Sequence, residues 1–158
     1  MKLLRSFGYA FQGLWRCINY ERNMRIHIVA ALYVLVFSLF FDLTATQYGV
    51  LFVLIGLVMA LELINTALEA AGNAITTKRD PNIKILKDTA AGAVLIFAIA
   101  ALAVAAVFFW DGQGFCRMYA FFVGQPLYLL LLGLGTALSL FFIAVSPVQL
   151  AEKIRKKK

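Results

Sequence analysis

The sequence has few of the residues that build metal centres or covalent cross-links. It contains two cysteines, Cys17 and Cys116, which lie far apart with no C-x-x-C spacing, and one histidine, His27. Zinc and haem sites are recognised by several such ligands at short, regular spacings. The sequence therefore disfavours a zinc or haem protein.

Two familiar motifs are also missing. No G-x-x-x-x-G-K-[ST] sequence and no glycine-rich phosphate loop occurs among the 158 residues, so any nucleotide would have to be held by separate side chains. Residues 2–19 contain neither a long apolar core nor the small-residue cleavage pattern of a secretory signal peptide. We therefore expect these residues to belong to the folded protein.

Acidic residues are scarce, whereas apolar residues are abundant. The chain has 15 Lys and Arg against 8 Asp and Glu, and 63 % of its residues are hydrophobic. Its mean hydropathy is +0.85. Soluble domains are about 45–50 % apolar, so this is the composition of an integral membrane protein. A net charge of +7 would suggest nucleic acid in a soluble protein. Here the basic residues flank apolar runs, which indicates a membrane protein with no nucleic-acid partner.

Four apolar stretches are candidates for membrane spans, and their approximate bounds are 26–41, 48–75, 89–110 and 121–145. Each can supply the roughly 20 residues that a spanning helix needs, although the first is short and is expected to begin among the charges of ERNMRIH. Before them, residues 2–19 place apolar side chains at helical spacing with basic residues between, which predicts an amphipathic helix in the membrane interface. The predicted fold class is an all-α membrane protein with a surface helix and four transmembrane helices.

The distribution of Lys and Arg predicts how the chain is oriented. Fourteen of the 15 lie in the N-terminal segment, in residues 76–88 and in the C-terminal tail, and the remaining one is Arg117. Cytoplasmic loops carry the excess of basic residues in membrane proteins. Both termini and the 76–88 loop of this multi-pass protein are therefore expected in the cytoplasm.

A stripe of polar residues interrupts the second span. Glu62, Asn65, Glu69 and Asn73 recur at i, i+3, i+7 and i+11, which places them on one side of a helix. If the span enters at Tyr48 on the outer side, Glu62 lies about 21 Å and Glu69 about 31 Å along it, in a hydrocarbon core roughly 30 Å thick. The stripe therefore reaches the cytoplasmic boundary of the membrane.

Three interpretations of this stripe are open. A carboxylate within a span is costly and is a functional candidate by default. The structural interpretation is that the stripe joins helices through hydrogen bonds. A second interpretation is an ion or proton pathway through a transporter or channel. A third is a metal-dependent enzyme site in which Glu69 and another acid hold Mg²⁺.

Two further clusters favour the enzyme. In YERNMR, Glu21 and Arg25 are spaced i, i+4, which alone would indicate a solvated helix pair. The segment TTKRDPNIKILKD brings four cations and two Asp next to the stripe, which alone would indicate an ordinary cytoplasmic loop. Together they place Glu21, Glu69 and Asp88 beside several cations at one membrane level, as Mg²⁺ and a triphosphate require. A transport path would also need polar groups in YGVLFVLIGLVMAL, the first half of the second span, which has none.

Four motifs resemble those of one family. They are GYAFQGL (8–14), ERNMRIH (21–27), ELINTALEAAGN (62–73) and KDTAAGAVL (87–95). In this order and at these distances they resemble the prokaryotic integral-membrane diacylglycerol kinase and undecaprenol kinase family. The resemblance covers residues 1–110 and implies a three-span core that assembles as a homotrimer with composite active sites. It implies transfer of the γ-phosphoryl group of MgATP to a lipid hydroxyl at the cytoplasmic face of the bacterial cell membrane.

The resemblance also implies roles for individual residues. Glu62 is the expected general base and Asn65 orients the site, while Glu21 and Glu69 are the expected Mg²⁺ ligands. The nucleotide is expected to contact Lys87 and Asp88, with four further residues lining its site: Tyr9, Lys78, Arg79 and Asp80. The depths agree with this division, since a base must reach a hydroxyl at the headgroup level, whereas Glu69 lies two turns nearer the water.

Two features depart from the family pattern. Lys2 stands where the family can carry an arginine for the nucleotide, which keeps the charge and loses bidentate geometry. Residues 111–158 add a fourth span and the basic tail KIRKKK, which could pack around the trimer, recruit a partner or bind anionic lipid. The form of ERNMRIH resembles the undecaprenol branch, so undecaprenol is the expected substrate, with diacylglycerol as the alternative.

Overall fold

The computed structural model describes residues 2–76, 78–146 and 148; the tail KIRKKK and the side chain of Lys2 lie outside this description. The described residues form helices and no strand, which confirms the predicted all-α class. In chain order the helices are α1 (Lys2–Tyr20), α2 (Arg22–Ser38), α3 (Ala45–Ile75), α4 (Pro81–Phe108), α5 (Gly112–Gly124) and α6 (Pro126–Ala144). Three of them, α3, α4 and α6, are long and apolar enough to cross a membrane.

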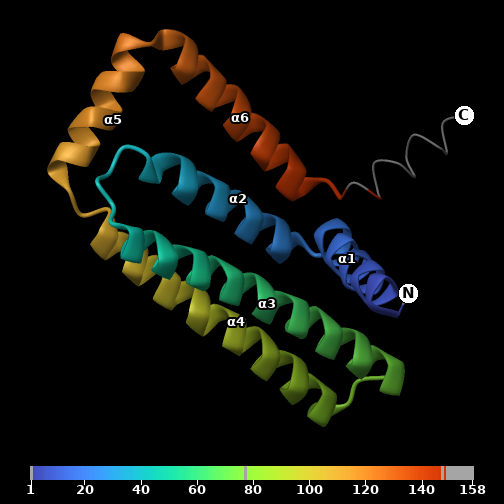
Figure 1. Ribbon diagram of the computed structural model, residues 1–158. Helices are drawn as coiled ribbons and strands as arrows, with labels where there is room; N and C mark the ends of the chain where they lie inside the picture. Colours follow the sequence, from blue (N-terminus) through green and yellow to red (C-terminus); the bar gives the residue numbers. More distant parts are fainter. Residues whose placement is uncertain (1, 77, 147, 149–158) are drawn as a thin grey trace, which may run out of the picture.

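The helix of the first predicted span begins and ends a few residues earlier than its predicted bounds. It was placed at 26–41, whereas α2 begins at Arg22, among the charges, and ends at Ser38. Its 17 residues cover about 26 Å, slightly less than the roughly 30 Å of a hydrocarbon core. Residues 39–41 form a turn instead of a last helical turn. Glu21, in extended backbone, separates α2 from α1, and α1 lies across the end of the bundle (Figure 1).

Local caps extend the next two helices beyond the predicted spans. Thr44 and Gln47 form a capping box, so α3 begins at Ala45 and not at 48. Asp80 accepts hydrogen bonds from the first backbone N–H groups of α4, and Pro81 occupies the first helical position. As a result, α4 begins eight residues before the predicted span. The predicted 76–88 loop is therefore reduced to a short connection, and its later basic residues lie on the first turns of α4.

The predicted fourth span, 121–145, is divided between two helices. α5 ends at Gly124 and α6 begins at Pro126. Proline disfavours helical backbone in the residue before it, and Gln125 accordingly has φ −134° and ψ 74°. The spanning helix is therefore α6, with 19 residues, and α5 is a separate short helix that connects it to α4 (Figure 1).

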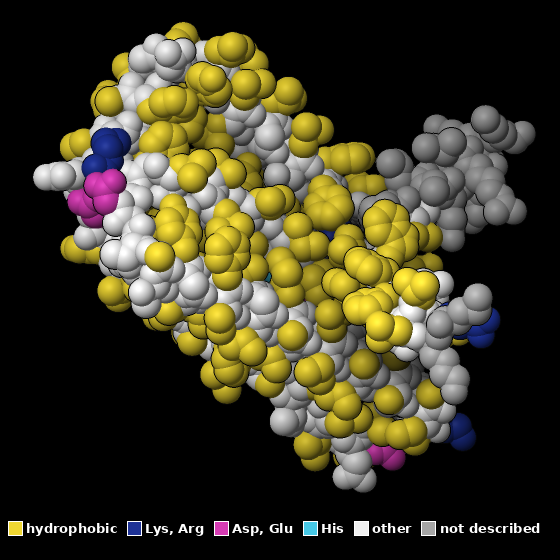
Figure 2. Space-filling model, viewed as in Figure 1, with side chains coloured by type: hydrophobic (Ala, Val, Ile, Leu, Met, Phe, Trp, Pro, Cys, Tyr) yellow, Lys and Arg dark blue, Asp and Glu magenta, His cyan; other side chains and the backbone are white. Residues whose placement is uncertain are grey.

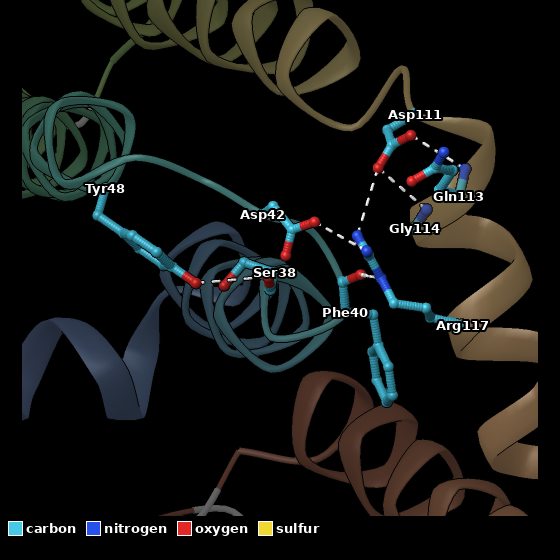
Figure 3. A network of polar contacts seen from close by, with 8 residues as sticks. All are labelled: Ser38, Phe40, Asp42, Tyr48, Asp111, Gln113, Gly114 and Arg117. Carbon is cyan, nitrogen blue, oxygen red and sulfur yellow. Dashed lines mark hydrogen bonds and ion pairs between the residues drawn. The ribbon is translucent and has the colours of Figure 1, made fainter.

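A network of polar contacts around Arg117 (Figure 3) and a cluster of aromatic rings fasten α5 to the end of α2. The guanidinium group of Arg117 pairs with Asp42 at 2.8 Å and with Asp111 at 3.4 Å, and its Nε donates to the carbonyl oxygen of Phe40 at 2.9 Å. The buried ring of Phe41 packs edge-on against Phe109 and Phe115, with centroid distances of 4.9 and 5.3 Å. Arg117 thus connects three segments at this end.

The helices bring distant basic segments to one end of the bundle. α1, the α3–α4 connection and the end of α6 lie together at one end, and the α2–α3 and α4–α5 connections lie at the other (Figure 1). Hydrophobic side chains cover most of the visible face between them (Figure 2). This arrangement suits a protein embedded in a membrane with its basic segments on one side.

Candidate active site

Two stripe residues line a pocket between three helices. Glu62 is 1 % exposed and Asn65 is 6 % exposed. The pocket holds about 220 Å³ and is formed by Asn23, Ile26 and His27 of α2, by these two residues of α3, and by Ala91, Val94, Leu95 and Ala98 of α4. Asn23 and His27 were not predicted as site residues, although both belong to the ERNMRIH motif at a spacing of i, i+4, which places them on one face of α2.

Glu62 makes none of the hydrogen bonds that a structural role would require. Three buried oxygens lack a hydrogen-bond partner among the described residues: both carboxylate oxygens of Glu62 and Oδ1 of Asn65. Buried polar groups in native proteins are nearly always paired, so each exception needs an explanation. The nearby polar side chain of Asn23 on α2 acts on the Glu62 carboxylate without a hydrogen bond of ordinary geometry, an arrangement that a purely structural joint between helices would not favour.

Glu21 and Glu69 lie within electrostatic reach of each other. Burial raises the pKa of Glu21 above its ordinary value, the Glu69 carboxylate raises it further, and the Arg25 guanidinium lowers it. Nδ2 of Asn65 donates to Oε1 of Glu69 at 3.4 Å. In the described part of the chain, no group of three His, Cys, Asp or Glu is placed to hold a metal. Two carboxylates with repelling charges nevertheless suit Mg²⁺, which commonly takes one or two protein carboxylates and completes its shell with phosphate oxygens and water.

An ion pair between Glu21 and Arg25, which their spacing alone would indicate, is absent from the ion pairs of the described residues. Arg25 is 4 % exposed, and it donates to the carbonyl oxygens of Ile18, Asn19 and Ile143 at 3.1, 3.1 and 3.3 Å. These carbonyls lie at the C-terminal ends of α1 and α6, where backbone oxygens lack helical partners and the helix dipole favours a cation. Arg25 therefore joins helix ends, and among the described residues the Glu21 carboxylate has no ion pair.

A second, larger cleft lies at the α3–α4 connection. It holds about 630 Å³, and its lining includes Asn73, Thr76, Lys78, Arg79, Asp80, Pro81, Ile83, Lys84, Lys87 and Asp88. Nζ of Lys87 donates to Oδ1 of Asn73 at 2.7 Å, and Lys84 pairs with Asp88 at 3.4 Å. The cleft thus collects the five predicted nucleotide-binding residues that follow α3. It also adds Asn73 and Lys84, which the sequence reasoning had left without a role in the site.

The structure does not gather all the predicted residues into one pocket of one chain. Glu62 and Asn73 lie about 16 Å apart along α3, so the buried pocket and the basic cleft are at different heights. Tyr9 is 70 % exposed on α1 and lines neither of them. Glu21 and Glu69 lie at the α1–α2 junction and on α3, outside the residues that line the two cavities.

Similarity to known sequences identifies the protein family in which this buried carboxylate and this basic cleft occur together. Residues 8–109 match the family described as prokaryotic diacylglycerol kinase. The chain belongs to this family. It is therefore a lipid kinase, a phosphotransferase that acts on an alcohol group, in a bacterial membrane. Family membership also decides against the transporter or channel, since the match includes both the stripe and the basic cleft.

Three relatives show how far the similarity extends. Undecaprenol kinase of Bacillus subtilis is 40 % identical over 98 residues, which are 62 % of this chain and 80 % of that protein. Diacylglycerol kinase of Synechocystis is 42 % identical over 103 residues, or 65 % of this chain and 59 % of that protein. Diacylglycerol kinase of Escherichia coli K12 is 28 % identical over 113 residues, or 72 % and 93 %. The family match leaves α5 and α6 outside it.

Proposed function

We propose that this lipid kinase transfers the γ-phosphoryl group of ATP to the hydroxyl group of undecaprenol, with Glu62 as general base. The observation that carries this proposal is the Glu62 carboxylate, which is 1 % exposed and has no hydrogen-bond partner among the described residues. A lipid hydroxyl that enters the adjacent pocket would supply the missing hydrogen bond. It would also present its proton to the base at the distance that proton transfer needs.

The proposed transfer involves the Glu62 carboxylate, the lipid hydroxyl group and the γ-phosphoryl group of ATP. A carboxylate oxygen of Glu62 accepts the hydroxyl proton while the lipid oxygen forms a bond to the γ-phosphorus. The bond from the γ-phosphorus to the bridging oxygen breaks, and ADP leaves with that oxygen. Asn65 donates to Glu69 through Nδ2 and keeps Oδ1 unpaired within the described structure. It can therefore orient both carboxylates relative to the hydroxyl.

Glu21 and Glu69 would hold Mg²⁺. Their mutual repulsion and the burial that raises the pKa of Glu21 both favour a bound cation. When bound, Mg²⁺ would neutralise charge on the phosphates, which is most of what phosphoryl transfer requires of a protein.

The basic cleft is the proposed site of ATP. Four cations line it, Lys78, Arg79, Lys84 and Lys87, and they replace the phosphate loop that the sequence lacks. Asp80 is partly committed as the N-cap of α4, because its Oδ1 accepts from the N–H groups of Asn82 and Ile83 at 2.8 and 3.2 Å. We therefore propose that Asp80 shapes the cleft, while Asp88 and Lys87 contact the nucleotide.

Composite sites in a homotrimer would complete this arrangement. On one chain, the Glu62 pocket and the basic cleft are separate cavities, and exposed Tyr9 lines neither. A neighbouring chain could bring its own α1 and cleft to the pocket.

We also propose that residues 1–110 form the kinase domain and 111–158 an extension. Both termini and the active site would face the cytoplasm, as the concentration of Lys and Arg in the N-terminal segment, the α3–α4 region and the C-terminal tail supports.

The preference for undecaprenol rests on the surroundings of the pocket. An apolar groove of about 180 Å³ shares His27 and Ala98 with the pocket and continues between α2, α3 and α4 toward the other end of the bundle. A polyprenol has one hydroxyl and a long hydrocarbon chain, which suits one polar pocket followed by an apolar groove. The similarity to the Bacillus subtilis undecaprenol kinase adds support. Diacylglycerol is the alternative, since two of the relatives carry that name.

A phosphoryl-transfer assay tests the proposal. The purified protein is given γ-labelled ATP and Mg²⁺ in mixed micelles, with undecaprenol and diacylglycerol in parallel and a chelator control. We expect labelled undecaprenyl phosphate in excess over labelled phosphatidic acid, and neither product with the chelator. More product from diacylglycerol would reverse the choice of lipid. No labelled lipid from correctly folded protein would overturn the proposed reaction.

A further inference from the structure

The junction between α1 and α2 is held by an unusual set of contacts. We define residues 17–25 as the elbow, in which Glu21 has extended backbone and donates its N–H to the carbonyl oxygen of Cys17 at 2.8 Å. Arg25 donates to Ile18 and Asn19 within the elbow. The elbow is also tied to α3, because Sγ of Cys17 lies 3.3 Å from Oγ1 of Thr66, the residue one turn after Glu62.

The remaining contacts come from the far end of the chain. The carbonyl oxygen of Ile143, in the last turn of α6, accepts from Nη2 and Nε of Arg25 at 3.3 and 3.4 Å. Oγ of Ser146 donates to the carbonyl oxygen of Asn19 at 2.6 Å. Asn19 is 3 % exposed and Ser146 is 5 % exposed, so these are protected bonds. Figure 1 shows the end of α6 beside the α1–α2 junction.

These contacts determine where Arg25 points. Arg25 lies in the first turn of α2, four residues after Glu21, and its charge acts on the Glu21 carboxylate although Glu21 itself has extended backbone. Here the guanidinium group is instead occupied by the carbonyls of α1 and α6. If the α6 carbonyl were withdrawn, the Glu21 carboxylate, on which the Arg25 charge already acts, would offer the guanidinium group a charged acceptor in its place. An Arg25–Glu21 pair would compete directly with a metal ion for that carboxylate.

We infer that the end of α6 is a positioning element of the active site, which holds the elbow and keeps Arg25 off the Glu21 carboxylate. The C-terminal extension would then be needed for normal metal binding, although it lies outside the part of the chain that matches the family. The inference rests on the proposed role of Glu21 as an Mg²⁺ ligand. Ser146 and Ile143 act through Arg25 and Asn19 and touch no reacting atom.

The test uses the full chain and two readouts, of which one needs no activity. Ser146→Ala removes the bond to Asn19, and Ser146→Thr retains a hydroxyl. Thr136→Val is the matched control, because Oγ1 of Thr136 lies 2.8 Å from the hydroxyl of Tyr33 and forms another polar contact between α6 and α2, away from the elbow. All variants carry Cys116→Ser, which removes the exposed thiol and leaves buried Cys17 as a probe of the elbow.

The first readout is the rate at which a maleimide labels Cys17 without Mg²⁺ or ATP, and the second is the Mg²⁺ concentration for half-maximal activity. Loss of one buried hydrogen bond should raise both by about twofold to tenfold in Ser146→Ala. Ser146→Thr and Thr136→Val should match the parent, with kcat at saturating Mg²⁺ preserved throughout. Chromatographic profiles that match the parent confirm that each variant is folded.

Glu21→Gln in the same assays separates this inference from the proposed function. If Glu21→Gln raises the Mg²⁺ requirement but Ser146→Ala behaves like Thr136→Val, the positioning inference is wrong and the proposed function stands. Faster Cys17 labelling in Ser146→Ala with an unchanged Mg²⁺ requirement also overturns the inference. If Glu21→Gln leaves the Mg²⁺ requirement unchanged, the proposed metal site and the inference both fall.

Discussion

The contact between Gly114 and Phe41 makes a sharp prediction about how the extension is held. A Cβ atom built on Gly114 would lie 2.4 Å from Cδ1 and 2.6 Å from Cε1 of Phe41. The Phe41 ring is 6 % exposed and is held edge-on by Phe109 and Phe115, at 4.9 and 5.3 Å. The ring therefore has little room to retreat. Gly114→Ala must displace either this aromatic cluster or α5 itself.

The magnitude follows from two opposing effects. Replacing glycine by alanine within a helix stabilises it by as much as about 1 kcal/mol. Overpacking a well-filled site costs about 1–3 kcal/mol. Gly112→Ala is the matched control, since it lies in the same helix and a Cβ there meets nothing within 4 Å. The difference between the two variants isolates the clash, and we expect Gly114→Ala to be the less stable by about 1–3 kcal/mol.

Thermal unfolding in detergent micelles measures this difference. For a chain of this size, each kcal/mol corresponds to a shift in Tm of about 2–4 °C. Phe41→Leu should remove most of the effect of Gly114→Ala when the two are combined, because the smaller side chain vacates the space that the methyl group needs. Equal Tm values for Gly114→Ala and Gly112→Ala would refute the packing of α5 against Phe41.

Three further perturbations follow from the structure. Arg117→Met should lower the free energy of unfolding by about 1 kcal/mol at low salt, and by less at high salt, because its partner Asp42 is exposed; a loss that salt does not change would contradict this. Lys87→Met removes the cation that Asn73 holds at 2.7 Å, and it should raise KM for ATP by about tenfold or more; an unchanged KM would remove the basic cleft from the nucleotide site. Burial and Glu69 raise the pKa of Glu21, so the folded state binds the carboxyl proton more tightly than the unfolded state. Stability therefore falls as the pH rises from the ordinary pKa of Glu21 through its raised pKa in the folded state. Without metal, Glu21→Gln should therefore raise Tm at neutral pH, but it should not raise Tm at a pH below 4.5, the ordinary pKa of a glutamate. An equal gain in Tm at neutral and at acidic pH would count against the raised pKa of Glu21.

The helical plan of the protein was largely predictable because membrane composition leaves few choices. Long apolar runs must form helices in lipid, and the excess of basic residues at alternate connections indicated which ends share a side. The stripe was visible because its spacing is helical. What was missed depended on local caps: Asp80 begins α4 early, and Pro126 divides the last span into α5 and α6.

The contacts of the site were harder to predict, because they depend on residues far apart in the chain. The bond from Arg25 to Ile143 joins residues 118 positions apart, and that from Ser146 to Asn19 joins residues 127 apart. Spacing alone favoured a Glu21–Arg25 pair, because it treats the two residues as part of one helix, whereas Glu21 has extended backbone before α2. The α6 carbonyl that draws Arg25 away comes from the extension, to which the sequence assigned no mechanism.

The most direct test of the central claim is the rate of phosphoryl transfer by Glu62→Gln at saturating ATP, Mg²⁺ and undecaprenol. Glutamine keeps the size and polarity of the side chain and cannot accept the hydroxyl proton, so we predict that kcat falls by about 10²–10⁴-fold while KM for ATP is unchanged. Thr136→Val, which changes a polar contact away from the pocket, should keep the parent rate. A Glu62→Gln variant that phosphorylates the lipid at nearly the parent rate would show that the buried carboxylate is not the base.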